Sequence, residues 1–211
     1  MNAEPRILRT QAEDTFAAEY QAARARLPGG PGMAAARDAA FAAFQAAGLP
    51  HRRVESWRYT DLRALVRAVP PLAGEAPSDA AEFADPLPGL DRARLVIVDG
   101  VYRPELSDLS GLDGVMVQPM AALMEADDPR IGTAFAKIDD SMVSLNAALM
   151  SGGVAIDVPA GVAIARAIEI AHVTTSAVGA YVRNAVHVGE GASVRIIESH
   201  VGRAGSAYQA N

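Results

Sequence analysis

The sequence predicts an α+β protein, with a helical N-terminal domain followed by a strand-rich domain of stacked coils. The first part of the chain is rich in alanine and spaces its aromatic residues as a helix does, whereas β-branched runs begin near residue 95. Two segments near the C-terminal end also superimpose at an offset of 30 residues, as solenoid repeats do. We therefore expect helices over residues 1–70, a proline-rich linker over 71–94 and a partial β-solenoid over 95–211.

Two amphipathic helices and a third, short one are predicted at the start. Residues 11–27 place aromatic side chains on one face and end at a Pro-Gly-Gly-Pro sequence. Residues 33–47 repeat the pattern and end at Gly48, which suits the left-handed residue that follows a helix. A third helix should begin at Thr60 or Asp61, because either side chain can cap the first turn.

The repeat defines the strand-rich part. Residues 154–164 superimpose on 184–194, and Gly161 corresponds to Gly191 at a predicted corner. We expect apolar positions one repeat apart to stack inside the coils, namely Ile156 on Val186, Val158 on Val188 and Ile164 on Val194. Periodicity alone leaves an alternative open, in which the segments are two similar hairpins of an ordinary β-sandwich.

Composition excludes several classes of protein. The 211 residues contain no cysteine, so disulfides, thiolate nucleophiles and cysteine-ligated clusters cannot form within this chain. The formal net charge of −6 argues against nucleic acid as the main partner, because phosphate binding needs clustered positive charge. The N-terminus has no apolar signal segment, and no run of residues is apolar enough to cross a membrane. We expect a cytoplasmic protein.

One segment resembles a known family. Residues 48–62, GLPHRRVESWRYTDL, resemble the signature near the N-terminus of the SufB/SufD family of iron–sulfur cluster assembly proteins. Further stretches agree in the same order: LNAAL at 145–149, IDVPAG at 156–161, RN at 183–184, VGEG at 188–191 and IESHVG at 197–202. The likeness spans nearly the whole chain, and its signature residues are Arg53, Glu55, Trp57, Tyr59 and Thr60.

The resemblance implies a fold and a function. The fold would be a helical domain followed by a right-handed parallel β-helix. The function would be that of a non-catalytic scaffold subunit, acting with a SufB-like subunit and a SufC-like ATPase in cluster assembly or iron delivery. No cofactor is expected on this chain alone, and iron or a cluster is expected only in the complex. Family members are longer, so we expect the later coils and the SufC-binding helices to lie beyond Asn211.

Trp57 and Tyr59 have two interpretations. Trp, Tyr and Arg dominate partner-binding hot spots, so the signature segment could be a docking site. We favour packing instead, with both aromatic side chains holding the third helix in place while Arg52, Arg53 and Glu55 form ion pairs.

Three histidines of the strand region, His172, His187 and His200, are candidate metal ligands. Their spacings could place them on neighbouring coils, where imidazole nitrogens bind iron or zinc. A solvent-facing histidine is the commoner case, and the alternation of the strand gives His187 the same outward phase as Asp157.

The sequence favours no catalytic site. The acid pairs at 127–128 and 139–140 are adjacent residues whose side chains diverge, so we interpret them as turn or cap residues. Nucleotide-binding loops and a nucleophile elbow are absent from the sequence. Two alternatives to the scaffold remain, a secreted-type β-helix enzyme acting on polysaccharide and a non-functional truncated remnant. A solenoid with an open last coil should also self-associate.

Overall fold

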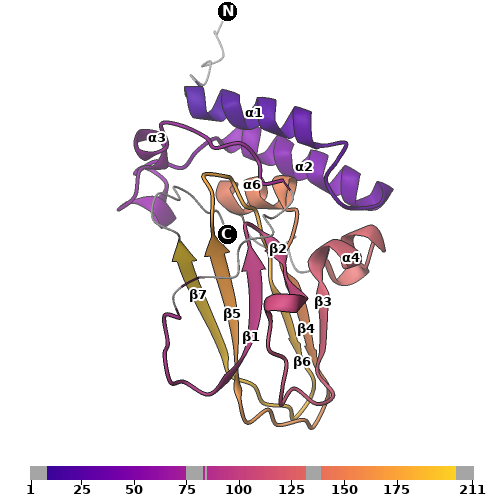
Figure 1. The fold of residues 1–211 in the computed structure, drawn as a ribbon. Coiled ribbons are helices and arrows are strands. Elements are labelled where there is room, and N and C mark those ends of the chain that lie inside the picture. The colour runs from indigo at the N-terminus through magenta and orange to yellow at the C-terminus, as the bar shows by residue number, and fades with distance from the viewer. Residues whose placement is uncertain (1–8, 75–82, 84, 132–138, 203–211) are drawn as a thin grey trace, which may run out of the picture.

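The computed structural model describes residues 9–74, 83, 85–131 and 139–202, which form a layer of helices above two facing groups of strands (Figure 1). The α+β class and the N-terminal helices are confirmed. Among the described helices, none is both long and apolar enough to cross a membrane.

Three helices share one core. They are α1 (Gln11–Ala23), α2 (Pro31–Ala47) and α6 (Ser141–Leu149). The side chain of Thr10 accepts a hydrogen bond from the amide of Glu13, whose carboxylate accepts one from the amide of Thr10, so α1 begins with a capping box. The buried members of this core include Phe16, Tyr20, Phe41, Phe44, Leu145, Leu149 and Tyr181.

The signature segment forms short helices below this layer. A 3₁₀ turn, η1, spans Glu55–Trp57, and α3 spans Leu62–Leu65. Of the two predicted caps, Asp61 is the one used, since its side chain accepts from the amide of Ala64 at 3.1 Å. The predicted third helix is therefore confirmed, with one turn only.

The strands form two small mixed sheets. The first has the order β2-β1-β5-β7 and consists of β1 (Arg92–Val98), β2 (Val101–Tyr102), β5 (Ala167–Thr174) and β7 (Ile196–Gly202). The second has the order β3-β4-β6 and consists of β3 (Met116–Pro119), β4 (Val154–Val158) and β6 (Ala185–Val188). Two short helices connect them, η2 (Pro104–Leu106) and α4 (Met120–Glu125). The described strands thus form mixed sheets rather than the continuous solenoid that we expected.

The register of the second sheet agrees with the repeat. Strands β4 and β6 pair in parallel, and Ile156 lies opposite Val186, 30 residues further on. The corner glycines also correspond, because Gly161 and Gly191 both have left-handed backbones, with φ of 73° and 71°. In the first sheet β5 and β7 are parallel too, with Ile168 opposite Ile196 at an offset of 28.

The main apolar core of this part lies between the two sheets. It contains alternate residues of the strands: Ala93, Leu95, Ile97, Val154, Ile156, Val158, Ile168 and Ile170. Val186 and Val188 continue the same face of β6, yet they are 40% and 43% exposed. The expectation that they are covered as Ile156 and Val158 are is therefore wrong, because β6 is an edge strand of the described sheet and has no described neighbour beyond it.

Two contacts tie the helices to the strand part. Asp127, just after α4, accepts hydrogen bonds from the amides of Gly32 and Met33 and so caps α2, whose N-cap residue Gly30 has no side chain to do so. Arg37 of α2 donates to the carbonyl oxygen of Ala148 in α6 at 3.0 Å. The interpretation of the acid pair 127–128 as cap and turn residues is confirmed for Asp127.

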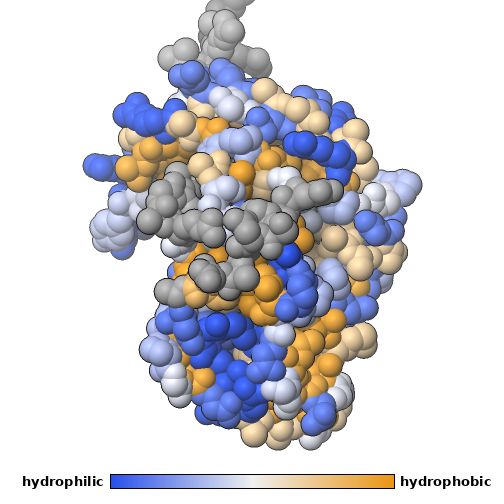
Figure 2. Space-filling view, viewed as in Figure 1, coloured by the Kyte–Doolittle hydropathy of each residue, from blue (hydrophilic) through white to orange (hydrophobic). Residues whose placement is uncertain are grey.

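The segment between the helical and strand parts is described in part. Leu72 is buried in the helical core and bridges Gly179, while residues 75–82 and 84 of the expected linker lie outside the described residues. Hydrophilic side chains cover the lower strand region on the face shown in Figure 2, whereas apolar ones lie between this region and the helices.

Candidate functional site

The signature segment is fixed at its start by a buried carboxylate. Leu49, which is buried, donates its amide hydrogen to Glu13 at 2.7 Å. Burial alone would raise the pKa of Glu13, but hydrogen bonds from Thr10 and Leu49 and the nearby charge of Arg63 outweigh it and hold the pKa below 4.5. The segment therefore leaves α2 in a defined direction.

Trp57 joins the signature to α6. Its indole nitrogen donates to Asp140 at 2.8 Å, and the second oxygen of Asp140 accepts from the amide of Met142 at the start of α6. Asp140 is thus a helix cap, as we expected for the acid pair 139–140. Trp57 is half-buried, so its role combines packing with one hydrogen bond.

The packing interpretation is wrong for Tyr59. This side chain is 85% exposed and carries the guanidinium of Arg58 over its ring at 4.7 Å. The expected ion pairs also differ, because Glu55 pairs with Arg58 at 3.0 Å and not with Arg52 or Arg53. Much of the signature is therefore surface that the described part of the chain does not cover.

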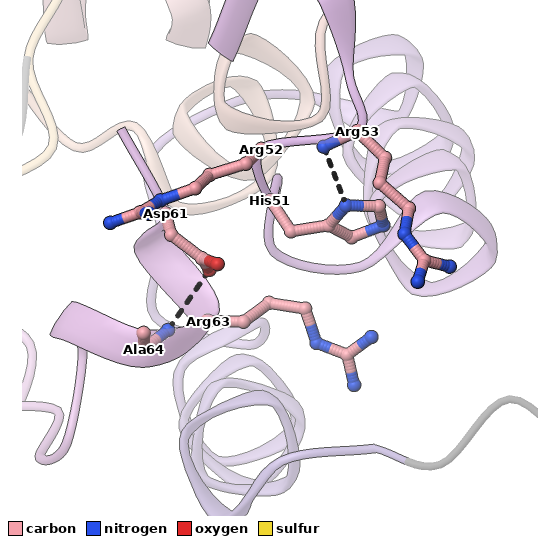
Figure 3. Close-up of a pocket in the computed structure, with 6 residues that line it drawn as sticks. All are labelled: His51, Arg52, Arg53, Asp61, Arg63 and Ala64. Atoms are coloured by element: carbon pink, nitrogen blue, oxygen red, sulfur yellow. Dashed lines mark hydrogen bonds between the residues drawn. The ribbon is translucent and has the colours of Figure 1, made fainter. Parts of the chain in front are cut away.

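A basic pocket lies beside this surface (Figure 3). It has a volume of about 490 Å³ and is lined by His51, Arg52, Arg53, Asp61, Arg63 and Ala64. The side chain of Asp61 is engaged with the amide of Ala64, and three guanidinium groups surround the opening. Such a pocket suits a carboxylate or phosphate, which arginine binds through two parallel hydrogen bonds.

The structure brings together two of the three candidate histidines. Strand pairing places His172 of β5 directly opposite His200 of β7, and their rings stack with centroids 4.7 Å apart and planes 7° from parallel. Glu198 lies on the same face of β7, two residues before His200. Its carboxylate is 2.9 Å from Nε2 of His172 and 3.9 Å from Nε2 of His200.

His172 is fully buried and neutral near pH 7. Burial and the neighbouring His200 outweigh the attraction of Glu198 and lower the pKa of His172 to about 4. Asn184 fixes the remaining geometry, because its oxygen accepts from the amide of Val154 and its nitrogen lies 3.1 Å from Nε2 of His172. Nδ1 of His172 has no hydrogen-bond partner among the described residues.

His187 does not join this cluster. It lies opposite Asp157 on the other face of β6, with its side chain 72% exposed and Nδ1 3.6 Å from the Asp157 carboxylate. It lines a cavity of about 290 Å³ under α4, together with Arg130 and Ile131. A metal site that includes all three histidines is therefore not formed.

Reasoning from the sequence missed Glu198 and Asn184. The signal for Glu198 was its position two residues from His200, since side chains two apart share one face of a strand. Asn184 could not be found in this way, because it belongs to the other sheet and reaches His172 only in the folded protein.

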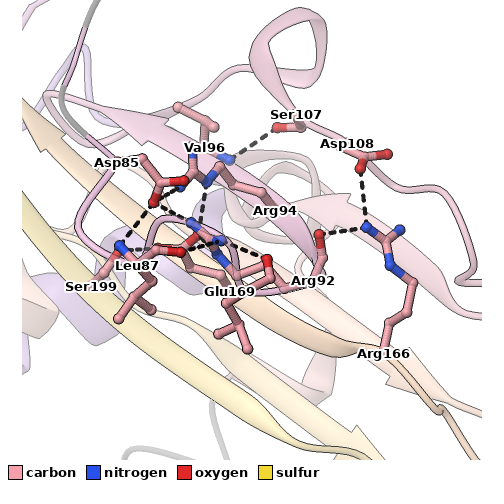
Figure 4. A network of polar contacts seen from close by, with 11 residues as sticks. Asp85, Leu87, Arg92, Arg94, Val96, Ser107, Asp108, Arg166, Glu169 and Ser199 are labelled. Atoms are coloured by element: carbon pink, nitrogen blue, oxygen red, sulfur yellow. Dashed lines mark hydrogen bonds and ion pairs between the residues drawn. The ribbon is translucent and has the colours of Figure 1, made fainter.

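A second polar cluster, on the outer face of the first sheet, was also missed (Figure 4). Glu169 of β5 is fully buried and accepts from Arg94 at 2.7 Å and from Ser199 at 2.6 Å, as well as from Arg92. Asp85 pairs with both arginines. Burial alone would raise the pKa of Glu169, but these hydrogen bonds outweigh it and hold the pKa below 4.5.

Comparison with known proteins defines the class. Residues 10–170 match the family model described as "SufBD protein N-terminal region". The chain therefore belongs to the SufB/SufD family, as the signature at 48–62 predicted.

A particular relative extends this result. The chain is 32% identical over 161 residues to the protein named "Iron-sulfur cluster assembly protein SufD" of Escherichia coli (strain K12). The alignment covers 73% of this chain and 36% of that protein, so the chain spans about a third of its relative's length. His172, Glu198 and His200 all lie beyond the residues matched by the family model.

Proposed function

We propose that this chain is a scaffold subunit of the SUF iron–sulfur cluster assembly complex, acting in the cytoplasm with a SufB-like subunit and a SufC-like ATPase. The observation that carries the proposal is membership of the SufB/SufD family over residues 10–170. In this role the chain catalyses no reaction, and ATP hydrolysis belongs to the SufC-like partner. The lack of cysteine supports a scaffold that holds no cluster by itself.

The proposed architecture is the beginning of a right-handed parallel β-helix. Its support is that the facing sheets advance by one strand over nearly the same length of chain, 30 residues from β4 to β6 and 28 from β5 to β7. A solenoid requires such matched advances, because every coil must contribute one strand to each face. Bridges at Gly152–Val182 and Ala163–Ser193 keep the same offset of 30 outside the strands.

The proposed contact surface for the SufB-like subunit lies at the edge strands β6 and β7. Val186, Val188 and Ile196 are 40%, 43% and 38% exposed there, although they continue the apolar face between the sheets. Unpaired strand edges with exposed apolar side chains favour pairing with a further strand. We call these three residues the apolar edge.

Co-purification tests the proposal. The tagged chain is co-expressed with SufB-like and SufC-like subunits from one genome, and we expect it to retain the SufB-like subunit. Val188→Lys should reduce this retention at least about tenfold, because a charge would be desolvated in the contact. Val101→Lys is the matched control, since Val101 is equally exposed, at 40%, but lies on β2.

Two results would contradict the proposal. Failure of the wild-type chain to retain the SufB-like subunit would remove the scaffold role. Equal loss with both lysine variants would show that the apolar edge is not the contact.

A further inference from the structure

We propose that His172, Glu198 and His200 form a binding site for a divalent first-row transition-metal ion such as Zn²⁺ or Fe²⁺. The inference rests on this chain's own side chains and goes beyond the proposed scaffold role, which needs no metal on this subunit. Two imidazoles and one carboxylate form a ligand set that both ions accept, and three protein ligands leave positions open for water or a further ligand.

The strand register assembles the three ligands. Parallel pairing of β5 with β7 sets His200 beside His172, and Glu198 stands on the same face beside Ile170. One donor atom from each residue lies within 4.8 Å of the others. The positions are unusual for a polar cluster, because this face of β5 otherwise contributes Ile168 and Ile170 to the apolar core between the sheets.

Hydrogen bonding leaves the centre of the cluster unsatisfied. The amide nitrogen of Asn184 donates toward Nε2 of His172, because the Asn184 oxygen is occupied by the amide of Val154. Nε2 must then present a lone pair, and the same atom lies 2.9 Å from the carboxylate of Glu198. Two electron-rich atoms this close repel each other, and a cation bound to both would turn the repulsion into attraction.

The cluster is fixed on one side and adjustable on the other. His172 has no exposed surface, whereas the side chains of Glu198 and His200 are each 48% exposed. Metal–ligand bonds of about 2.0–2.2 Å require the donor atoms to lie within roughly 4 Å of one another. Binding must therefore rotate His200 out of its stacked position and draw its Nε2 and the Glu198 carboxylate toward His172.

Titration of the tag-free, metal-free full chain with Co²⁺ tests the site, since Co²⁺ reports its ligands through visible absorption. We expect one Co²⁺ per chain, displaced by Zn²⁺. His200→Ala and Glu198→Gln should each weaken binding at least about tenfold, because each removes a direct ligand. His187→Ala is the matched control, because this exposed histidine lies on another face and its loss should leave the affinity unchanged.

Circular dichroism shows whether each variant is folded, and both ligand substitutions are at half-exposed positions chosen to preserve folding. Absence of Co²⁺ binding by the wild-type chain would overturn the proposal. So would unchanged affinity in His200→Ala and Glu198→Gln, or an equal loss in His187→Ala. Retention of the SufB-like subunit is a separate measurement, so failure of the metal site and failure of the scaffold role are distinguishable.

Discussion

The single indole of this chain illustrates how one residue can serve two parts of the molecule. Trp57 belongs to the signature segment, while its hydrogen-bond partner Asp140 begins a helix 83 residues later. Its neighbour Tyr59 is almost fully exposed, so the two aromatic residues of the signature have different roles. The sequence could not separate them, because both stand among arginines in a segment without regular periodicity.

The first prediction separates these roles. Trp57→Phe should lower the free energy of unfolding by about 1–2 kcal/mol, because it leaves the Asp140 carboxylate without its indole donor. Trp57→Ala should cost roughly 2–4 kcal/mol, less than a fully buried aromatic residue would. Tyr59→Ala, the control, should stay within about 0.5 kcal/mol of the wild type in the same urea titrations. A loss with Tyr59→Ala as large as with Trp57→Ala would contradict the assignment of roles.

The second prediction concerns Glu169 and acid stability. Its pKa in the folded protein lies below 4.5, so its charged form stabilises the fold above that pH, and this contribution is lost as the pH falls through the lowered value. Ser199→Ala removes one donor, raises the pKa of Glu169 and should move the midpoint of acid unfolding to higher pH. Ser193→Ala, an exposed site, should not move it. Circular dichroism across pH 2–6 measures both, and identical midpoints would disprove the role of Ser199.

At the scale of elements, local patterns predicted what depends on neighbours in sequence. Aromatic spacing predicted α1 and α2, and the offset of 30 predicted the pairing of β4 with β6. The offset of 28 between β5 and β7 was beyond the repeat, because the turn after Val194 is two residues shorter than the turn after Ile164. That difference places His172 opposite His200, so the candidate metal cluster depends on a turn length that periodicity does not reveal.

Pairing across long stretches of chain was equally hidden. Strand β1 lies parallel to β5 with Arg92 opposite Ala167, which brings both arginines of β1 onto Glu169. Nothing local in the sequence of β1 indicates this partner. An acid within the apolar strand Ala167–Thr174 was the available signal that a buried ion pair is needed.

For the whole molecule, the apolar edge predicts self-association of the isolated chain. Sedimentation velocity over a wide concentration range should show species larger than the monomer at high concentration, because apolar strand edges pair with one another. Ile196→Lys should suppress these species, since a charge opposes edge pairing. Leu109→Lys, a change at an equally exposed residue away from the edge, should not. A monomer at all concentrations would disprove this prediction.

The helical layer also has a consequence for the order in which the protein is made. Helices α1 and α2 leave the ribosome first, yet the core that they bury includes Leu145, Leu149 and Tyr181. The cap of α2 comes from Asp127, still later in synthesis than either helix. The first helices therefore wait, with their aromatic faces uncovered, until most of the chain has been translated, and this interval is the one in which a nascent chain of this kind depends most on chaperones.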